Sequence, residues 1–176
     1  VPPSGARIRL CIEADQRAGS LLDALERANG WATFYCTPEF MENNGDLLRR
    51  LAVSGSAVGL LLDPEDPAES LDQQLKRGND ALYRATLTRT RLVYADGGEE
   101  TLQALEQLGY SCLTPDMDRT DYKLESAANA AALLKRVSAR RRDVSVWLGT
   151  TASAAGVKEF VSSAQREGHY CRAMTE

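Results

Sequence analysis

Acidic side chains follow several of the apolar runs of this chain, where they could bind a metal ion or another polar ligand. If the runs are parallel strands, their carboxyl ends meet at one edge of a sheet, which is the usual place for ligands in such folds. Hard cations such as Mg²⁺ and Ca²⁺ prefer oxygen ligands. The acids could instead be solvated loop residues near strand ends. Five carboxylates stand at such positions: Glu13, Asp15, Asp63, Glu65 and Asp96.

Histidine and serine chemistry have little support. His169 is the only histidine in the sequence, and it falls in the last expected strand, so we interpret it as a structural or solvent-facing residue. Ser153, Ser162 and Ser163 lie on an expected helix without a glycine elbow or a histidine partner. Nucleophilic catalysis by a serine is therefore not expected.

The four cysteines, Cys11, Cys36, Cys112 and Cys171, have no CxxC spacing. Each stands in a short apolar run that is typical of a strand or a strand end, which favours small buried thiols. A disulfide between two neighbouring strands is the alternative if the domain is exported.

Short apolar runs alternate with amphipathic helical segments along the whole chain. Helices of ten or more residues between strands require crossover connections, so the pattern predicts an α/β fold with a parallel sheet. It leaves open whether the sheet closes into a small barrel or is doubly wound. The expected strands are 8–13, 31–36, 57–62, 91–95, 110–114, 144–148 and 169–173. The expected helices are 20–30, 46–53, 68–86, 98–108, 126–140 and 152–167.

Length and charge limit the classes of protein. A chain of 176 residues with 43% hydrophobic and 26% charged residues can bury one sizeable core. We expect a linker or N-terminal extension at 1–6 and a single domain at 7–176. The net charge of −4 argues against a nucleic-acid partner. No apolar stretch approaches the ~20 residues of a membrane span, so membrane insertion of this segment is not expected. The start at Val1 rather than Met suggests a segment of a longer protein.

Four segments are similar, in the same order, to those of one known family. Residues 21–40 (LLDALERANGWATFYCTPEF) resemble its helix followed by an Ala-Thr-Phe-Phe strand, and residues 55–59 (GSAVG) stand where it carries Gly-His-Glu-Ile-Gly. Residues 101–110 resemble its helix before a strand, and residues 116–122 its Asp-x-Asp-x-x-Asp-Trp segment. This is the polysaccharide deacetylase family, also called the NodB-homology domain or carbohydrate esterase family four. The resemblance implies a distorted (β/α) barrel of about seven parallel strands.

The resemblance also implies a reactive site, most of whose side chains this chain lacks. Family enzymes use a divalent metal held by one Asp and two His, an Asp as base and a His as acid. The Asp-Asp pair of the family falls on Ala14 and Asp15, so the base is lost and one metal-binding carboxylate survives. The two histidine ligands fall on Leu61 and Glu65, and leucine cannot coordinate a metal.

Two further family segments have lost their reactive residues. The loop that begins with the orienting arginine starts here at Leu92, and the Leu-His pair that supplies the acid falls on Leu148 and Gly149. By this implication zinc is not expected as a cofactor, and family-type deacetylation should be undetectable. A calcium or magnesium site formed by Asp15, Asp63 and Glu65 is the alternative.

Two hypotheses of function follow. The favoured one is a catalytically inactive deacetylase-like domain, a scaffold or a glycan- or partner-binding module of a larger cell-envelope or secreted protein. The expected partner is a glycan or another protein domain of the same chain. The other is a carbohydrate-active hydrolase of the deacetylase type, acting on C–N bonds other than peptide bonds through carboxylates alone. The family resemblance implies an extracellular or cell-envelope location. An aromatic ring among the groove residues could stack on a sugar. The groove candidates are Asp15, Glu65, Asp96, Asp121 and Tyr122.

Overall fold

The computed structural model of the protein describes residues 5–118 and 123–176. Within them are seven β-strands and seven α-helices, with one helix between successive strands except for the two that separate the second strand from the third. The described residues divide into two compact units: unit 1 holds residues 5–33, 115–118 and 123–174, and unit 2 holds residues 34–114 and 175–176. The expectation of a linker or N-terminal extension at 1–6 and one domain at 7–176 stays a prediction.

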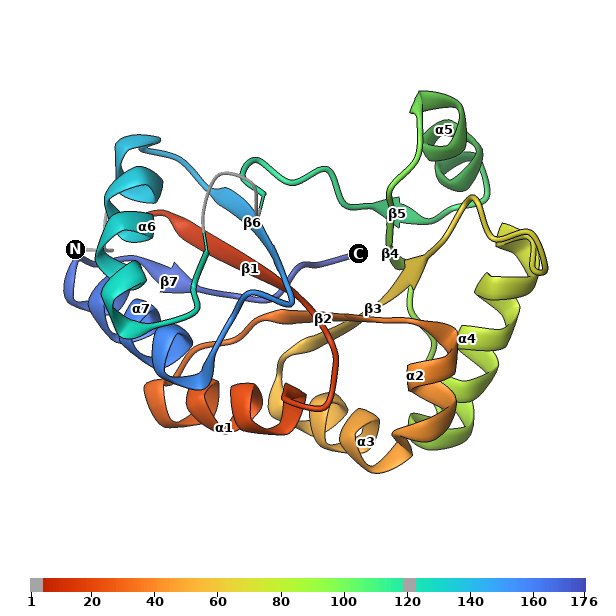
Figure 1. The fold of residues 1–176 in the computed structure, drawn as a ribbon, viewed down its shortest axis with the longest axis horizontal. Coiled ribbons are helices and arrows are strands. Elements are labelled where there is room, and N and C mark those ends of the chain that lie inside the picture. The colour runs from red at the N-terminus through yellow and green to blue at the C-terminus, as the bar shows by residue number, and fades with distance from the viewer. Residues whose placement is uncertain (1–4, 119–122) are drawn as a thin grey trace. The chain divides into compact units, whose positions relative to one another are not determined.

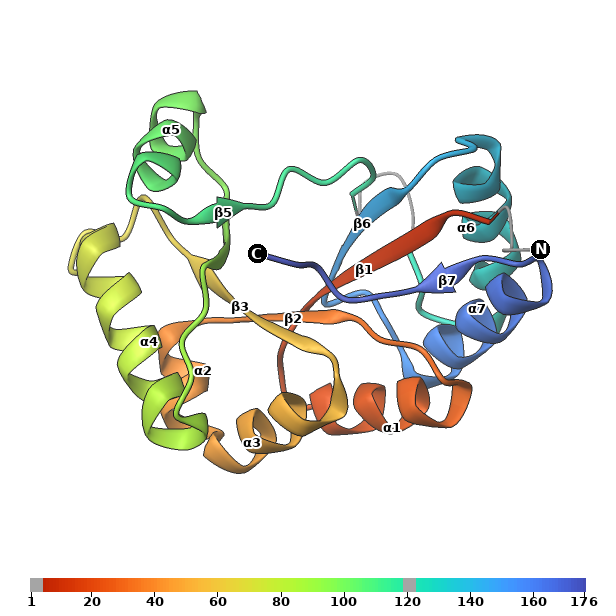
Figure 2. The same ribbon diagram turned by 180° about the vertical axis from the view of Figure 1, so that it is seen from behind.

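Unit 1 is built around β1 (Arg7–Glu13), which pairs in parallel with β6 (Val144–Gly149) and with β7 (Tyr170–Cys171). Residues 8, 10, 11 and 12 of β1 are almost completely buried, as expected for a parallel strand covered on both faces. The unit has three helices: α1 (Ala18–Ala28), α6 (Ala127–Ala139) and α7 (Ala154–Arg166). Helix α7 packs against α1 and α6 (Figure 1), and the view from behind shows β7 beside β1 (Figure 2).

Unit 2 contains strands in the order β5–β4–β3–β2. They are β2 (Thr33–Cys36), of which residues 34–36 belong to this unit, β3 (Ala57–Leu62), β4 (Leu92–Ala95) and β5 (Ser111–Cys112). The pairs β3–β4 and β4–β5 are parallel. Helices α2 (Pro38–Asn43), α3 (Gly45–Ser54), α4 (Leu71–Thr86) and α5 (Glu99–Gln107) complete the unit, and α4 packs against α2 and α3.

Helix α2 lies outside the elements expected from the sequence. The Oγ1 atom of Thr37 accepts the N–H of Phe40 at 3.1 Å, and Pro38 follows at the first helical position, where no N–H is needed. A helix of six residues gives almost no periodic signal, so the Thr-Pro pair was its only indication.

The start and end of α1 also differ from expectation. The helix begins at Ala18 rather than at Ser20, and its C-cap is Asn29, with a left-handed φ of 55°. Gly30 follows the cap and donates its N–H to the C=O of Leu25 at 2.9 Å, which satisfies an open helix carbonyl. A Cβ at Gly30 would lie 2.6 Å from Cγ1 of Val161. Close packing of α7 is therefore the reason for glycine at this position.

Strands β5 and β7 have two residues each instead of the expected five. All four cysteines are free thiols, with Cys11, Cys36 and Cys171 buried and Cys112 half-buried. The buried-thiol interpretation is confirmed for three of them. In the described parts of the chain, no helix combines the length and the apolar character needed to cross a bilayer.

Candidate functional site

Unit 2 contains a cavity of about 520 Å³ at the carboxyl ends of three strands. Thr37 follows β2, Asp63 follows β3 and Asp96 follows β4, and all three line the cavity. Helix α4 adds Gln74 and Arg77 from one side. Parallel sheets commonly bind ligands at this edge, so the cavity is the candidate ligand site of unit 2.

The lining of this cavity is strongly acidic. Arg77 is its only cation among the residues that the structure describes there, whereas Leu61, Leu62 and two prolines supply apolar surface. Such a concentration of negative charge attracts cations and repels anions. Six carboxylates belong to the lining: Glu39, Asp63, Glu65, Asp66, Glu69 and Asp96.

Part of the acidic lining is held in place by its own backbone. Oδ1 of Asp63 accepts the N–H of Glu65 at 2.9 Å, and Oδ1 of Asp66 accepts the N–H of Ala68 at 2.8 Å. These are the side-chain turns that aspartate forms in loops. These bonds define the turns of the loop, and the side chains of Glu65 and Asp96 are exposed to solvent.

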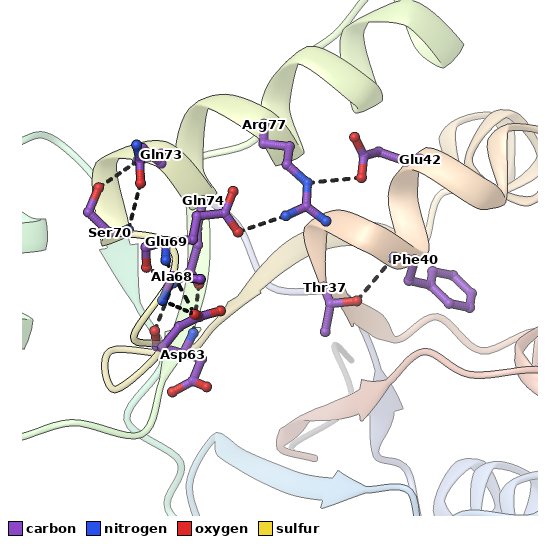
Figure 3. A network of polar contacts seen from close by, with 11 residues as sticks. Thr37, Phe40, Glu42, Asp63, Ala68, Glu69, Ser70, Gln73, Gln74 and Arg77 are labelled. Carbon is purple, nitrogen blue, oxygen red and sulfur yellow. Dashed lines mark hydrogen bonds and ion pairs between the residues drawn. The ribbon is translucent and has the colours of Figure 1, made fainter.

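Arg77 is neutralised by two carboxylates of the unit (Figure 3). Its Nε donates to Glu42 of α2 at 2.9 Å, and its Nη1 donates to Glu69 at 2.7 Å. Hydrogen bonds to Glu42 and Glu69 raise the pKa of Arg77 above its ordinary value. The guanidinium therefore joins α2 to α4 and leaves the remaining carboxylates to set the field of the cavity.

The residues predicted for the site lie in different parts of the structure. The structure brings Asp63, Glu65 and Asp96 together around the cavity of unit 2. Asp15 lies in unit 1. Asp121 and Tyr122 lie outside the described residues.

The positions at which the family's reactive residues are replaced have structural roles here. Ala14 and Leu92 are 7% and 3% exposed and serve packing, and Gly149 ends β6 with a left-handed φ of 57°. Among residues 5–118 and 123–176, no three His, Cys, Asp or Glu side chains form a group that could hold a metal ion. The carboxylate site of Asp15, Asp63 and Glu65 stays a prediction.

Asp15 is engaged by a residue that the sequence did not single out. Its Oδ1 accepts the backbone N–H of Arg17 at 2.8 Å, and its Oδ2 lies 3.0 Å from Nη2 of the same arginine. The guanidinium also donates to the C=O of Ala152 at 3.1 Å and to the C=O of Thr150. Arg17 thus joins the loop after β1 to the loop after β6.

His169 has a structural position, as expected. Its Nδ1 accepts the N–H of Ala6 at 3.0 Å, and its Nε2 lies 3.0 Å from Oγ of Ser138. The carboxylate of Glu167 is 3.8 Å away. The ring therefore fixes the start of β1 to α6 and to the turn before β7.

Comparison with known proteins gives the fold. The sequence matches no protein-family profile and no curated protein. The structure is similar to the peptidoglycan deacetylase PdaC from Bacillus subtilis (TM-score 0.77, 18% identity, 99% of this chain and 90% of that chain covered). It is also similar to the polysaccharide deacetylase Bc1974 from Bacillus cereus (TM-score 0.75, 15% identity, 98% and 92% covered).

A third similar structure is a mutant of BA3943, described as a CE4 family pseudoenzyme with restored enzymatic activity. It has a TM-score of 0.75 and 17% identity, and the match covers 98% of this chain and 67% of that one. At such identities the likeness shows the fold. The chain has the α/β fold of polysaccharide deacetylases, which confirms the predicted class of a distorted (β/α) barrel with about seven parallel strands.

The residues present do not fit the metal that the family resemblance implies. That metal takes two imidazoles and one carboxylate, and this sequence has a single histidine. The imidazole of His169 bonds Ala6 and Ser138, and the carboxylate of Asp15 bonds Arg17. Leu61, at the expected position of one imidazole, offers no lone pair.

Proposed function

We propose that this domain does not catalyse deacetylation in the manner of that family, and that it serves as a binding or scaffold module of a cell-envelope or secreted protein. The observation that carries the proposal is that the one surviving site residue is already engaged in an ion pair. Asp15, the one carboxylate retained from the implied metal site, is paired with Arg17 at 3.0 Å. Loss of the base and the acid removes the groups that take and give a proton in the family's reaction, and loss of both imidazole ligands removes two of the three donors to its metal.

The acidic cavity of unit 2 supports the binding role. A glycan that carries ammonium groups, or a basic segment of a protein partner, would find opposite charge at Asp63, Glu65 and Asp96. Neutral sugar hydroxyls can also donate to these carboxylates. Glu65 and Asp96 have exposed side chains, so both are accessible to such a ligand.

The similar structures support the inactive state and the location in different ways. BA3943 is described as a pseudoenzyme of the CE4 family, so this fold persists in a protein without its activity. PdaC is described as a peptidoglycan deacetylase. That name relates the fold to the bacterial cell wall, which supports the proposal of an envelope location for this chain.

The first experiment measures acetate release. The purified domain is incubated with chitin oligomers, acetylated xylan and peptidoglycan fragments in the presence of Zn²⁺, Co²⁺ or Mn²⁺, with PdaC as the positive control. We expect no acetate above the buffer level. Acetate release that disappears in Asp15→Asn would contradict the proposal, and release that survives in Asp15→Asn but disappears in Glu65→Gln would favour the hydrolase with a carboxylate-only site.

The second experiment measures binding by calorimetry with chitosan and chitin oligomers. Glu65→Gln combined with Asp96→Asn removes two carboxylates from the cavity, and Glu106→Gln removes an exposed one from α5 as the control. If the cavity binds glycans, the double variant loses affinity and the control does not. Absence of binding by the wild-type domain would exclude these oligomers as ligands and leave the scaffold role.

A further inference from the structure

The guanidinium of Arg17 is surrounded by oxygen acceptors of unit 1. Its Nε and Nη2 face the carboxylate of Asp15, at 3.3 Å and 3.0 Å from Oδ2. Its Nη1 donates to the C=O of Ala152 at 3.1 Å, and its Nη2 donates also to the C=O of Thr150. One carboxylate and two carbonyls are the type of oxygen set that proteins offer to a cation.

Both carboxylate oxygens of Asp15 are engaged by Arg17 in this arrangement. Oδ1 accepts the backbone N–H of Arg17 at 2.8 Å and lies 3.4 Å from Nε of its guanidinium, and Oδ2 lies 3.3 Å from Nε and 3.0 Å from Nη2. The planar fork of arginine matches a carboxylate through two parallel bonds, which fixes the orientation of both groups. A divalent ion at the same oxygens would bring two like-charged cations within a few ångströms, which Coulomb repulsion opposes.

The two carbonyls belong to a distant part of the chain. Thr150 and Ala152 follow β6, whereas Asp15 and Arg17 follow β1, and these two strands are hydrogen-bonded neighbours. The side chain of Asp15 is 22% exposed and that of Arg17 is 42% exposed. The pair is thus partly exposed to solvent, and the guanidinium connects the two strand ends.

We propose that Arg17 is a built-in cation that occupies the coordinating oxygens of Asp15, closes this carboxylate to metal ions and fixes the loop after β6 to the loop after β1. The proposal goes beyond the proposed function, because it would hold even if the acidic cavity of unit 2 carried an activity of its own. It assigns Arg17 a positioning role and no catalytic one.

The test uses thermal unfolding of the whole chain with Arg17→Gln, Arg17→Lys, Asp15→Asn and the Asp15→Asn/Arg17→Gln double variant. We expect Arg17→Gln to lower the Tm by about 2–6 °C, and Arg17→Lys to restore only part of the loss because an ammonium lacks the fork. The double variant should lose clearly less than the sum of the single losses. Arg27→Gln, at an exposed position of helix α1, which begins directly after Arg17, is the control and should change the Tm by less than about 2 °C.

The second arm titrates the wild-type chain with Mn²⁺ and Zn²⁺ and follows the Tm. We expect no rise of the Tm in either metal, because the oxygens of Asp15 are already bonded to Arg17. A metal-dependent rise that Asp15→Asn abolishes would overturn the proposal, and so would additive losses in the Asp15 and Arg17 variants. Acetate release that survives in Asp15→Asn would contradict the proposed function without altering either of these readouts.

Discussion

The side-chain amide of Gln74 bonds both backbone groups of Asp63: its Oε1 accepts the N–H at 2.8 Å, and its Nε2 donates to the C=O at 2.8 Å. The same Nε2 donates to the C=O of Glu69 at 3.0 Å. Gln74 is 3% exposed on the inner face of α4. Its amide supplies the donor and the acceptor that a neighbouring strand would supply, so it fixes the backbone where the acidic lining of the cavity begins (Figure 3).

Removal of this amide should destabilise the protein. Gln74→Leu keeps the size of the side chain but leaves the N–H and the C=O of Asp63 without their partner, and we expect a loss of about 1–2 kcal/mol in the free energy of unfolding. Urea unfolding measures it. Gln103→Leu on the exposed face of α5 is the control and should change stability by less than about 0.5 kcal/mol. Equal losses in the two variants would show that the amide does not hold the loop.

A second prediction concerns the close approach of Tyr35 to Gly59. A Cβ at Gly59 would lie 2.6 Å from two ring carbons of Tyr35 and 3.2 Å from the C=O oxygen of Leu92. Tyr35 is fully buried and cannot move without displacing other core residues. We expect Gly59→Ala to destabilise the protein by about 1–3 kcal/mol, the usual cost of overpacking.

Gly19 of α1 is the matched control for this variant. A Cβ at Gly19 would meet nothing within 4 Å, so Gly19→Ala should stabilise the protein by about 0.5–1 kcal/mol through helix propensity. The same substitution should therefore change the free energy of unfolding in opposite directions at the two positions. A neutral Gly59→Ala would show that β3 has room for a methyl group.

Local sequence signals predicted most of the strands and helices. Strand β3 has the expected bounds, 57–62, because a continuous apolar run stands between Gly55 and Pro64, two residues that interrupt regular structure. Helix α4 ends where expected, at Thr86, and begins at Leu71 behind a capping box of Ser70 and Gln73. The Ser-x-x-Gln pattern of the capping box is present in the sequence, but the helix was predicted to start at residue 68, directly after the acidic loop with its two prolines.

The contacts that build the candidate site could not be predicted in the same way. Arg17 reaches carbonyls 133 and 135 residues away, and any residue type supplies such carbonyls, so no residue pattern marks them. Gln74 and Arg77 stand on an amphipathic helix, where polar residues are normally solvated. Their roles depend on which loops pack against α4. The acidic loop residues were recognised because they follow strands directly.

The ion pairs of Arg77 lead to a third prediction. The side chains of Arg77, Glu42 and Glu69 are 37%, 36% and 20% exposed, so solvent screens the attraction and we expect Arg77→Met to cost about 0.5–1 kcal/mol. The cost should shrink in 1 M NaCl, where the Debye length is about 3 Å. Urea unfolding at low and high salt measures both values. Arg84→Met on the exposed face of the same helix is the control, and a cost for Arg77→Met that does not depend on salt would contradict the electrostatic account.

The four cysteines should differ in reactivity. Burial raises the pKa of the Cys11, Cys36 and Cys171 thiols to about 12. At pH 8 these thiols are protonated and inaccessible, whereas Cys112 is half-buried. We expect Ellman's reagent to modify one thiol quickly and the other three only as the protein unfolds. Cys112→Ala should remove the fast phase, and a second fast thiol in the wild-type protein would contradict the burial of the other three.

The same burial makes stability fall at alkaline pH. An unfolded thiol ionises near its ordinary pKa of about 9, whereas the three buried thiols keep their protons up to about 12. Between these values the folded state binds more protons than the unfolded state, so the free energy of unfolding decreases as the pH rises, by up to ~1.4 kcal/mol per pH unit for each buried thiol. Cys36→Ala removes one of these contributions. Urea unfolding at pH 8, 9, 10 and 11 should therefore show a shallower decrease in Cys36→Ala than in the wild type, and parallel decreases would show that Cys36 ionises equally in both states.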